Sequence, residues 1–432
     1  MAANTPAARM NRRLVQTAAI QVLAHDRASL KRAWPGIARQ IAAASKGGAQ
    51  MIVLPEGTLP AYVLGPEKFD SSETAEALAA CEMLARDLQV VLVIGAARAQ
   101  AGRVYNSAIV FDAGGKIAGS ADKHFLWHFD RQWFSGAEQL QPVQTSLGSL
   151  GVLICADGRI PTIARTLVDQ GAEVLVMPTA WVTSGRDPAN LENVQADLLA
   201  RVRARENGVP FVAANKCGVE LRCVAYCGKS QIVAADGTVA AVASETEPAI
   251  VASAIELGAR KPLRAGALSP AQAPNQSNSS VRIAITADQN PANTKELLAI
   301  LEAGVLISPE TATSALPQAV CVSDDVVGDP GGVAAYRLAG FDLAIWLTQG
   351  DDGWQVPFAR ARAVELRIYV VVLDTTSKRA YAVDPDGAIV CGTYGDYRIA
   401  SFTFDPARTR QTLVAPGTDV LQGLERAHAH AR

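Results

Sequence analysis

The chain has 432 residues, of which 49% are hydrophobic and 19% are charged, and its formal net charge is −2. This composition excludes a disordered chain, and the length predicts two or three domains with large buried cores. The near-neutral charge provides no basic surface for nucleic acid or an anionic membrane, and no apolar run reaches the ~18 residues of a membrane span.

Strands alternate with helices along residues 1–260, and tight turns join some of the strands into hairpins. Helices interleaved with strands and hairpins are typical of a mixed α/β sandwich. The expected elements are, in chain order, a strand at 17–22, a helix at 27–46, a strand at 51–54, a helix at 72–88, a strand at 90–94, a hairpin of 107–111 with 116–118, a helix at 161–170, a strand at 174–177, a helix at 190–207, a strand at 211–214 and a hairpin that turns at Asp236-Gly237.

A change of composition at Lys261 indicates a boundary between domains. Residues 261–280 are rich in Pro, Ala, Ser, Asn and Gln, which is typical of a linker. Beyond this linker the pattern of the first domain restarts, and repeats of this size in the same order predict a duplicated domain, with copies at 1–260 and 281–432. The corresponding segments are 281–285 with the first strand, 294–302 with the first helix, 305–310 with 52–56, 340–350 with 171–181, 362–374 with 203–215, and 386–387 with 236–237.

The second copy is shortened. Ten residues separate Glu310 from Cys321 in this copy. In the first copy 98 residues separate Glu56 from Cys155. When the corresponding segments are aligned without gaps, Asp324 falls opposite Cys155. We therefore expect one working site in the chain, in the first copy.

Cys155 stands where a buried strand ends, because the apolar residues 152–154 are followed by a polar segment that contains Gly158. The carboxyl ends of strands are where α/β sheets bind ligands. A lone cysteine is nevertheless more often an inert, buried residue. A catalytic role for Cys155 therefore requires a base and a cation elsewhere in the chain.

Two other segments supply such groups. Pro55 ends the strand at 51–54, so that Glu56 falls in the loop that follows. Lys123 precedes an apolar and aromatic stretch. Taken alone, Glu56 is typical of an exposed loop and Lys123 of a surface position before a strand.

Together the three segments resemble the motif blocks of the carbon–nitrogen hydrolase (nitrilase) superfamily. The blocks are LPEG (54–57), DKHFLWHFDRQWF (122–134) and ICADGRIP (154–161), and the resemblance covers about residues 14–257. It implies a four-layer αββα sandwich with a Glu, a Lys and a Cys at strand ends, and no cofactor or metal. The frame resembles the superfamily at 105–108, 178–181, 205–208, 228–230 and 236–237.

The resemblance implies a thiol amidohydrolase that forms a thioester on Cys155. A thiol attacks as the thiolate, and we expect the positive charge of Lys123 to lower the pKa of Cys155. Lys123 and the backbone N–H of Ala156 are expected to stabilise the oxyanion. Glu56 is expected to act as general base and then as acid toward the leaving amine.

The chain departs from the superfamily pattern at several positions. Many members have a second glutamate where this chain has Asp130, which is shorter by one methylene and is expected to orient Lys123 or the substrate. Tyr62, Arg159 and Trp181 are candidates for the substrate pocket, and Arg159 is able to bind a carboxylate through two hydrogen bonds. Arg159 is equally compatible with an ion pair to Asp157, and Trp181 with a core position.

The residues after the cysteine favour one branch of the superfamily. The nitrile-hydrolysing branch usually has Trp-Glu there, whereas Ala156-Asp157 favours amidases and carbamoyl hydrolases. We therefore expect hydrolysis of a small linear amide or N-carbamoyl compound by water. Nitrile hydrolysis and acyl transfer to an amine remain open, as does a silent ligand-binding scaffold, which the shortened second copy and Asp130 favour.

Cysteine usage and duplication bear on location and assembly. The seven cysteines are odd in number and scattered, which is typical of a reducing compartment, so we expect a cytoplasmic protein. Superfamily members typically pair their sandwiches across a two-fold axis. We expect the second copy to take the place of a partner subunit, which makes one chain a pseudo-dimer and leaves a homodimer open.

Overall fold

The computed structural model describes residues 13–183, 189–258, 262–266, 268, 270–273, 278–289, 291 and 294–430. The chain divides into two compact units, Met1–Gly158 with Thr166–Pro262, and Arg159–Arg165 with Leu263–Arg432. Each unit has its own sheets and its own buried core.

The first unit contains two sheets. Their strand orders are β11-β10-β1-β2-β3-β4-β5, with β14 also paired to β1, and β13-β12-β9-β8-β7-β6. The strands of the first sheet are β1 (Arg13–Leu23), β2 (Met51–Val53), β3 (Val91–Gln100), β4 (Arg103–Phe111), β5 (Ile117–Asp122), β10 (Lys216–Glu220), β11 (Val224–Cys227) and β14 (Ala249–Leu257). Those of the second sheet are β6 (Val143–Thr145), β7 (Gly148–Val152), β8 (Val174–Pro178), β9 (Phe211–Ala214), β12 (Gln231–Val233) and β13 (Val239–Val242).

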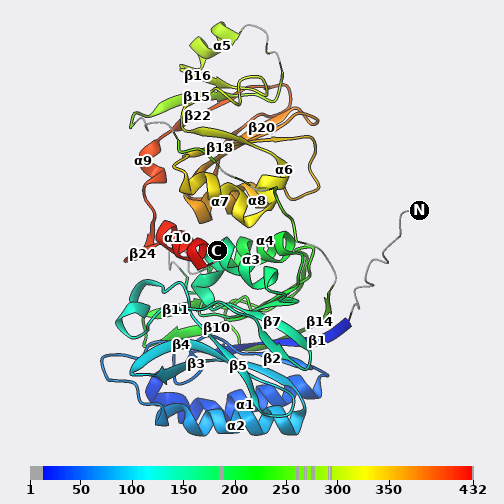
Figure 1. The fold of residues 1–432 in the computed structure, drawn as a ribbon, viewed down its shortest axis with the longest axis vertical. Coiled ribbons are helices and arrows are strands. Elements are labelled where there is room, and N and C mark those ends of the chain that lie inside the picture. The colour runs from blue at the N-terminus through cyan, green and yellow to red at the C-terminus, as the bar shows by residue number, and fades with distance from the viewer. Residues whose placement is uncertain are drawn as a thin grey trace, which may run out of the picture. The chain divides into compact units, whose positions relative to one another are not determined.

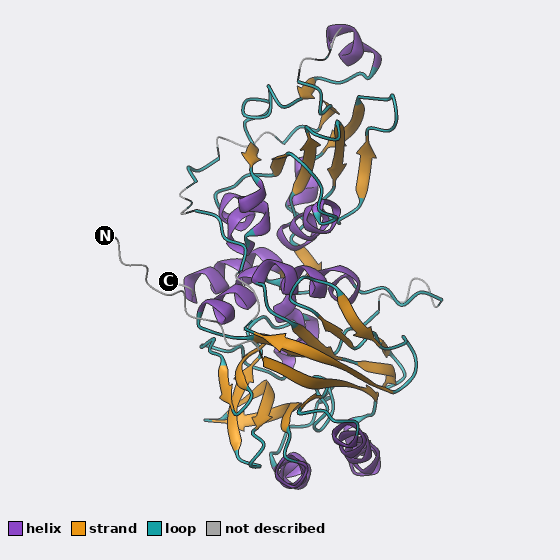
Figure 2. Ribbon diagram, turned by 90° about the vertical axis from the view of Figure 1, so that its right-hand side faces the viewer, coloured by secondary structure: helices purple, strands orange, loops and turns teal. Residues whose placement is uncertain are grey.

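Helices cover the outer faces of the two sheets. α1 and α2 pack on the first sheet, and α4 packs on the second (Figure 1). Between these helical layers, strands β1–β3 of the first sheet face β8 and β9 of the second. Figure 2 shows α1 and α2 nearly end-on beneath the first sheet. The unit is thus layered α-β-β-α, and the predicted mixed α/β fold is confirmed. The helical segments within residues 13–258 are η1 (Arg27–Ser29), α1 (Leu30–Lys46), α2 (Ser72–Leu88), η2 (His128–Gln132), η3 (Cys155–Arg159), α3 (Pro161–Asp169), η4 (Gln195–Leu199) and α4 (Ala200–Asn207).

Side-chain spacing explains why these helices form where they do. α2 buries Thr74, Ala77, Cys81 and Ala85, which recur every three or four residues and so make one stripe on a helix of 3.6 residues per turn. Ala77, Cys81 and Ala85 of this stripe join the apolar core between the helix and the first sheet. The helix ends where Gln89 takes a left-handed conformation with φ of 54°.

The helix expected at 190–207 begins later in the structure. A π-helical turn, η4, starts at Gln195 and leads into α4. Asn193 accepts a hydrogen bond from the Gln195 N–H at 3.0 Å, and Asp197 accepts one from the Asn193 N–H at 2.9 Å. These side chains satisfy backbone donors at the helix start, so the helix does not extend further toward the N-terminus.

The second unit also has two main sheets, β16-β15-β22 and β17-β18-β19-β20-β21. Between β16 and β17 the chain has only residues 308–318, and the described part of this unit contains no strand there. The elements are β15 (Val281–Ile285), α5 (Thr294–Ile300), β16 (Val305–Ile307), β17 (Ala319–Val322), α6 (Asp324–Gly328), α7 (Pro330–Leu338), β18 (Leu343–Thr348), α8 (Gln355–Leu366), β19 (Tyr369–Asp374), β20 (Arg379–Val383), β21 (Ile389–Gly392), β22 (Ala400–Phe404), α9 (Pro406–Thr409), β23 (Leu413–Ala415), β24 (Thr418–Asp419) and α10 (Val420–His430).

The strands of the five-stranded sheet in the second unit pair with the same relative directions as strands β7-β8-β9-β12-β13 in the first unit. Both begin with two parallel pairings and end with two antiparallel ones. Gly151 pairs with Leu175 in the first unit, and Val320 pairs with Ala344 in the second. Both residues of the second pair lie 169 positions after those of the first, so the register is the same.

None of the described helices has both the length and the apolar character that a membrane crossing requires.

Gly95 of β3 lies against the loop that carries Glu56. A Cβ atom at this position would lie 2.4 Å from the carbonyl oxygen of Pro55 and 2.5 Å from the Cα of Glu56. We expect Gly95→Ala to lower the free energy of unfolding in urea by about 1–3 kcal/mol, because the Glu56 loop must move. Gly114→Ala is the matched control, since a Cβ atom there meets nothing within 4 Å. Equal midpoints for the two variants would contradict this account.

Candidate active site

Glu56 lies in the loop after β2 and is fully buried. Its Oε1 accepts hydrogen bonds from Asn106 Nδ2 and from Lys123 Nζ, each at 2.7 Å. Its Oε2 has no hydrogen-bond partner within the described part of the chain. The carboxylate is therefore fixed by one oxygen, and the other is available to accept a proton.

Lys123 follows β5 and lies between two carboxylates. Its Nζ is 2.7 Å from Glu56 Oε1 and 2.5 Å from Asp130 Oδ2, and all three side chains are fully buried. Burial opposes the positive charge, but the negative charges of Asp130 and Glu56 outweigh it and hold the pKa of Lys123 well above its usual value. Lys123 is thus an ammonium ion with a fixed position.

Asp130 reaches Lys123 because it lies in the tight turn η2. The Asp130 N–H donates to the Trp127 carbonyl at 2.8 Å, and the Trp127 N–H donates to Asp130 Oδ2 at 2.9 Å. The Tyr62 hydroxyl donates to Asp130 Oδ1 at 3.1 Å. The turn directs the carboxylate toward Lys123, which compensates for a side chain one methylene shorter than glutamate.

Cys155 is the first residue of η3, just after β7, and it has a φ of 46°. Such a left-handed conformation costs a residue with a side chain about 1–3 kcal/mol, and residues of this kind are frequent at functional sites. The thiol faces Thr179 and the backbone of Ala180, at the carboxyl end of β8. Glu56 and Lys123 both act on it electrostatically, so the structure brings the three predicted residues together.

The expectation that Lys123 gives Cys155 a lowered pKa is wrong. Burial raises the pKa of the Cys155 thiol, the negative charge of Glu56 raises it further, and Lys123 only partly offsets both. The physical reason is burial, which together with Glu56 outweighs the lowering of the pKa by Lys123 that the sequence predicted. The resting site therefore holds a neutral thiol beside a carboxylate.

Asp157 ties the lysine segment to the cysteine segment. Its Oδ1 accepts hydrogen bonds from the His124 N–H at 3.1 Å and the Phe125 N–H at 2.6 Å, and its Oδ2 accepts one from the Ile154 N–H at 3.0 Å. Burial raises the pKa of Asp157 to about 7 even though these bonds lower it. One carboxylate thus fixes the backbone on both sides of the reacting groups.

The other residues that the sequence predicted for the site differ in their burial and in their hydrogen-bond partners. Ala156 follows Cys155 in η3 and is buried, as its expected backbone role requires. The hydroxyl of Tyr62 is used by Asp130 rather than left for a substrate. Trp181 is 1% exposed, which agrees better with a core position. Arg159 ends η3 and is partly exposed, and its binding of a carboxylate stays a prediction.

Asn106 of β4 is a positioning residue that the sequence did not single out. Its Nδ2 donates to Glu56 Oε1, and its carbonyl oxygen accepts a hydrogen bond from the Lys123 N–H at 2.8 Å. Asn106 thereby holds both the Glu56 carboxylate and the backbone of Lys123. The available signal was its place in the block at 105–108, which resembles the superfamily.

The comparisons with known proteins agree with this geometry. The carbon–nitrogen hydrolase family model matches residues 16–265, which are 250 of the 432 residues. The chain belongs to the carbon–nitrogen hydrolase family.

Each of the following relatives matches only part of the chain. The chain is 32% identical over 165 residues to a probable nitrilase of Schizosaccharomyces pombe, in a match that spans 38% of the chain and 58% of that relative. It is 29% identical over 272 residues to an N-carbamoylputrescine amidase of Solanum lycopersicum, spanning 59% of the chain and 90% of that relative. The crystal structure of a carbon–nitrogen hydrolase from Helicobacter pylori matches with a TM-score of 0.50 and 27% identity, covering 56% of this chain and 89% of that one.

The protonation state of Cys155 can be measured directly. Because its pKa is raised, we expect no thiolate at this position at neutral pH. The difference in ultraviolet thiolate absorbance between the unmodified protein and Cys155→Ser should show no titration below about pH 8, near the value of an ordinary thiol. A titration step near pH 6 in this difference would contradict a neutral resting thiol.

Removal of the Asn106 amide should weaken the hold on Glu56. Asn106→Ala loses a hydrogen bond to a charged acceptor, worth about 1.5–3 kcal/mol, or roughly 10- to 150-fold in rate. That bond favours the ionised carboxylate, so its loss raises the pKa of Glu56 and should shift the acidic limb of kcat/KM to higher pH. The exposed Asn190→Ala is the control. An unshifted acidic limb in Asn106→Ala would exclude this role.

Proposed function

We propose that this chain hydrolyses the C–N bond of a small linear amide or N-carbamoyl compound through a thioester on Cys155. The observation that carries the proposal is the buried arrangement in which Lys123 bridges Glu56 and Asp130 beside a thiol. Glu56 retains a free oxygen there, and Lys123 retains its charge.

The first step moves the thiol proton during the attack. Because the thiol is neutral at rest, Glu56 takes its proton through Oε2 as Cys155 Sγ bonds to the substrate carbon. Burial raises the pKa of Glu56, whereas Lys123 lowers it. A stronger base results, which suits a carboxylate that must accept a proton from a thiol.

Negative charge then develops on the substrate oxygen. An ammonium group has three N–H donors, and the contacts of Lys123 within the described residues use two of them, on Glu56 and Asp130. The third is left for the oxyanion, together with the backbone N–H of Ala156. Donors that are already in place stabilise this charge without reorganisation at the moment of reaction.

The remaining steps return the proton and add water. Glu56 gives its proton to the leaving nitrogen as the C–N bond breaks, and ammonia or an amine departs. Glu56 then takes a proton from water, whose oxygen attacks the thioester carbon. The acid product leaves, and Cys155 recovers its proton from Glu56, so each group returns to its starting state.

The substrate class is supported by sequence at the site and by relatives. Ala156-Asp157 follows the cysteine, as in amidases and carbamoyl hydrolases, and one relative is an N-carbamoylputrescine amidase. A probable nitrilase also matches, so nitrile hydrolysis is the alternative that the same assay must include.

We further propose that the second unit is a shortened, non-catalytic copy of the first. Side-chain contacts support the correspondence beyond the strand register. Buried pairs at i and i+3 recur as Arg203–Glu206 and Arg362–Glu365. Arg203 Nε donates to the Gly158 carbonyl at 3.0 Å, and Arg362 Nε donates to that of Val327 at 2.8 Å.

The position that corresponds to the nucleophile carries a different residue. Val327 lies 169 positions after Gly158, and the same offset relates Asp324 to Cys155. Asp324 accepts a hydrogen bond from Trp346 Nε1 at 2.7 Å. A carboxylate held in this way offers no thiol chemistry. The pseudo-dimer, the homodimer and the cytoplasmic location stay predictions.

A substrate panel tests the function. Small amides, N-carbamoyl compounds and nitriles should be separated by the products that appear, and intact mass should detect an acyl group on Cys155. Cys155→Ala and Glu56→Gln should lower kcat by at least about 10³-fold without unfolding the chain, because each removes a covalent or proton-transfer step. Cys321→Ala of the second unit is the matched control and should keep full activity. Activity retained in Cys155→Ala would overturn the proposal.

A further inference from the structure

A second buried lysine–carboxylate pair lies in the first unit, formed by Lys216 and Glu220 of β10 and called here the β10 pair. Both side chains are fully buried. Glu220 Oε2 accepts hydrogen bonds from Lys216 Nζ at 2.9 Å and from the Tyr226 hydroxyl at 2.7 Å. Because desolvation opposes the attraction in a buried ion pair, such a pair is weak evidence for stability. Its contacts indicate another reason for its presence.

The other oxygen of Glu220 holds the segment that carries Tyr62. We call residues 59–65 the strap. Glu220 Oε1 accepts a hydrogen bond from the Val63 N–H at 2.7 Å. The preceding residue is Tyr62, whose hydroxyl donates to Asp130. The rings of Tyr62 and Tyr226 also meet nearly edge to face, with centroids 6.4 Å apart and planes at 72°. The β10 pair and Asp130 thus fix Tyr62 from two sides.

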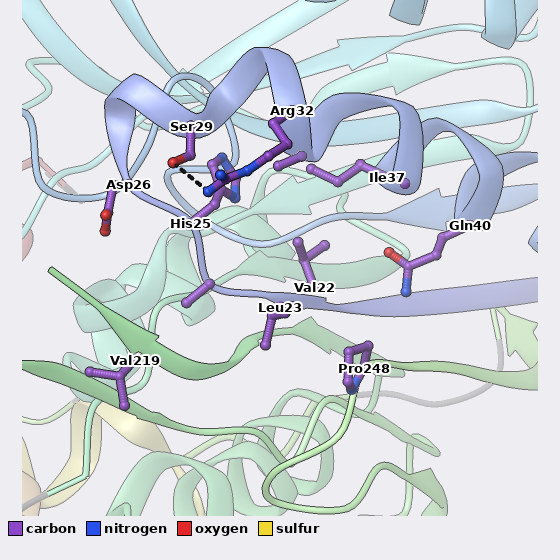
Figure 3. A pocket seen from close by; sticks show the side chains of 13 residues that line it. Val22, Leu23, His25, Asp26, Ser29, Arg32, Ile37, Gln40, Val219 and Pro248 are labelled. Atoms are coloured by element: carbon purple, nitrogen blue, oxygen red, sulfur yellow. Dashed lines mark hydrogen bonds between the residues drawn. The ribbon is translucent and has the colours of Figure 1, made fainter. Parts of the chain in front are cut away.

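Hydrogen bonds hold the strap at other points as well. His25 Nε2 lies 3.0 Å from the Pro60 carbonyl oxygen, and Arg27 Nη1 donates to the Leu64 carbonyl at 2.6 Å. His25 also lines a cavity of about 450 Å³ between β1 and α1, together with residues such as Arg32 and Gln40 (Figure 3). The strap itself is closely packed, because Leu59, Tyr62 and Leu64 are buried in apolar clusters. Its polar anchors add direction to this packing.

We propose that the β10 pair positions the catalytic lysine through the strap. The path runs from Glu220 to the peptide of Val63, then through the Tyr62 hydroxyl to Asp130, and from Asp130 to Lys123. This inference rests on the proposed function, in which Lys123 stabilises the oxyanion. Glu220 and Tyr62 are positioning residues in this scheme, because neither touches the reacting atoms.

The charges explain why the anchor is an ion pair. A carboxylate accepts the hydrogen bonds of Lys216, Tyr226 and Val63 at once, which a neutral amide does less well. The centre already holds the negative charges of Glu56 and Asp130. Lys216 neutralises the added negative charge of Glu220, and its Nζ lies 5.3 Å from the centre of the Tyr226 ring.

Two double variants separate anchoring from charge. Lys216→Met with Glu220→Gln, and Lys216→Met with Glu220→Leu, both remove the ion pair without leaving a lone buried charge. The glutamine keeps an acceptor for the Val63 N–H, and the leucine does not. We expect the leucine variant to lower kcat by about 10- to 100-fold with little change in KM, because Lys123 is misplaced, and the glutamine variant to lose less.

A double-mutant cycle tests the path itself. Tyr62→Phe should lower kcat in the unmodified protein, but should add little in the leucine variant, because both act through the same path. Additive losses would overturn the proposal. Arg362→Met with Glu365→Leu removes a buried pair of the second unit as the matched control. It should lower the Tm without a selective loss of kcat.

Alkylation of Cys155 by iodoacetamide, followed by peptide mass mapping that separates it from the exposed Cys223, provides a readout that needs no substrate. We expect the leucine variant to react more slowly than the glutamine variant. If the unmodified protein turns over no substrate but the leucine variant is still alkylated more slowly than the glutamine variant, the proposed function fails and the positioning role stands. If folded variants all keep the unmodified rate, the positioning role is overturned. If the leucine variant does not fold, the alkylation rate of Tyr62→Phe is the test. A rate equal to that of the unmodified protein would then overturn the positioning role.

Discussion

The structure of the site depends on one interaction, the sharing of the Lys123 ammonium between Glu56 and Asp130. All three charges are fully buried, so each requires the others. The shared lysine keeps its own charge and leaves Cys155 as a neutral thiol. The chemistry therefore has to move a proton to Glu56 during the attack.

The fold holds this interaction in place by fixing backbone rather than by adding contacts to the reacting atoms. Asp157 accepts N–H groups from both sides of the site, and Asn106 binds Glu56 while its own carbonyl holds Lys123. The β10 pair extends the same arrangement to the strap. Buried polar groups of this kind are satisfied almost completely, which is the condition under which they specify one geometry. Glu56 Oε2 has no partner among the described residues, and it is the atom that must accept a proton.

The second unit shares the register of the first without its chemistry. The contacts common to both units involve arginines such as Arg203 and Arg362, which fix helices and turns. The segment that carries Lys123 has no equivalent between β16 and β17. The shortened copy that we propose retains these arginine contacts, which join α4 to η3 and α8 to α6. The candidate catalytic groups come instead from strand ends of both sheets of the first unit.

The sequence by itself determined the alternation of strands and helices, because apolar periodicity reports which face of each element is buried. It also determined which residues stand at strand ends, since Pro55 and the polar residues after Cys155 stop their strands. The start of η4 was misplaced, because capping by Asn193 is a local choice that periodicity does not reveal. Only the tertiary structure decided the charge state of the thiol and the contact of Asp130 with Lys123. It also decided the positioning roles of Asn106 and Glu220. These depend on distances between residues far apart in the chain and on burial, which spacing along the sequence does not encode.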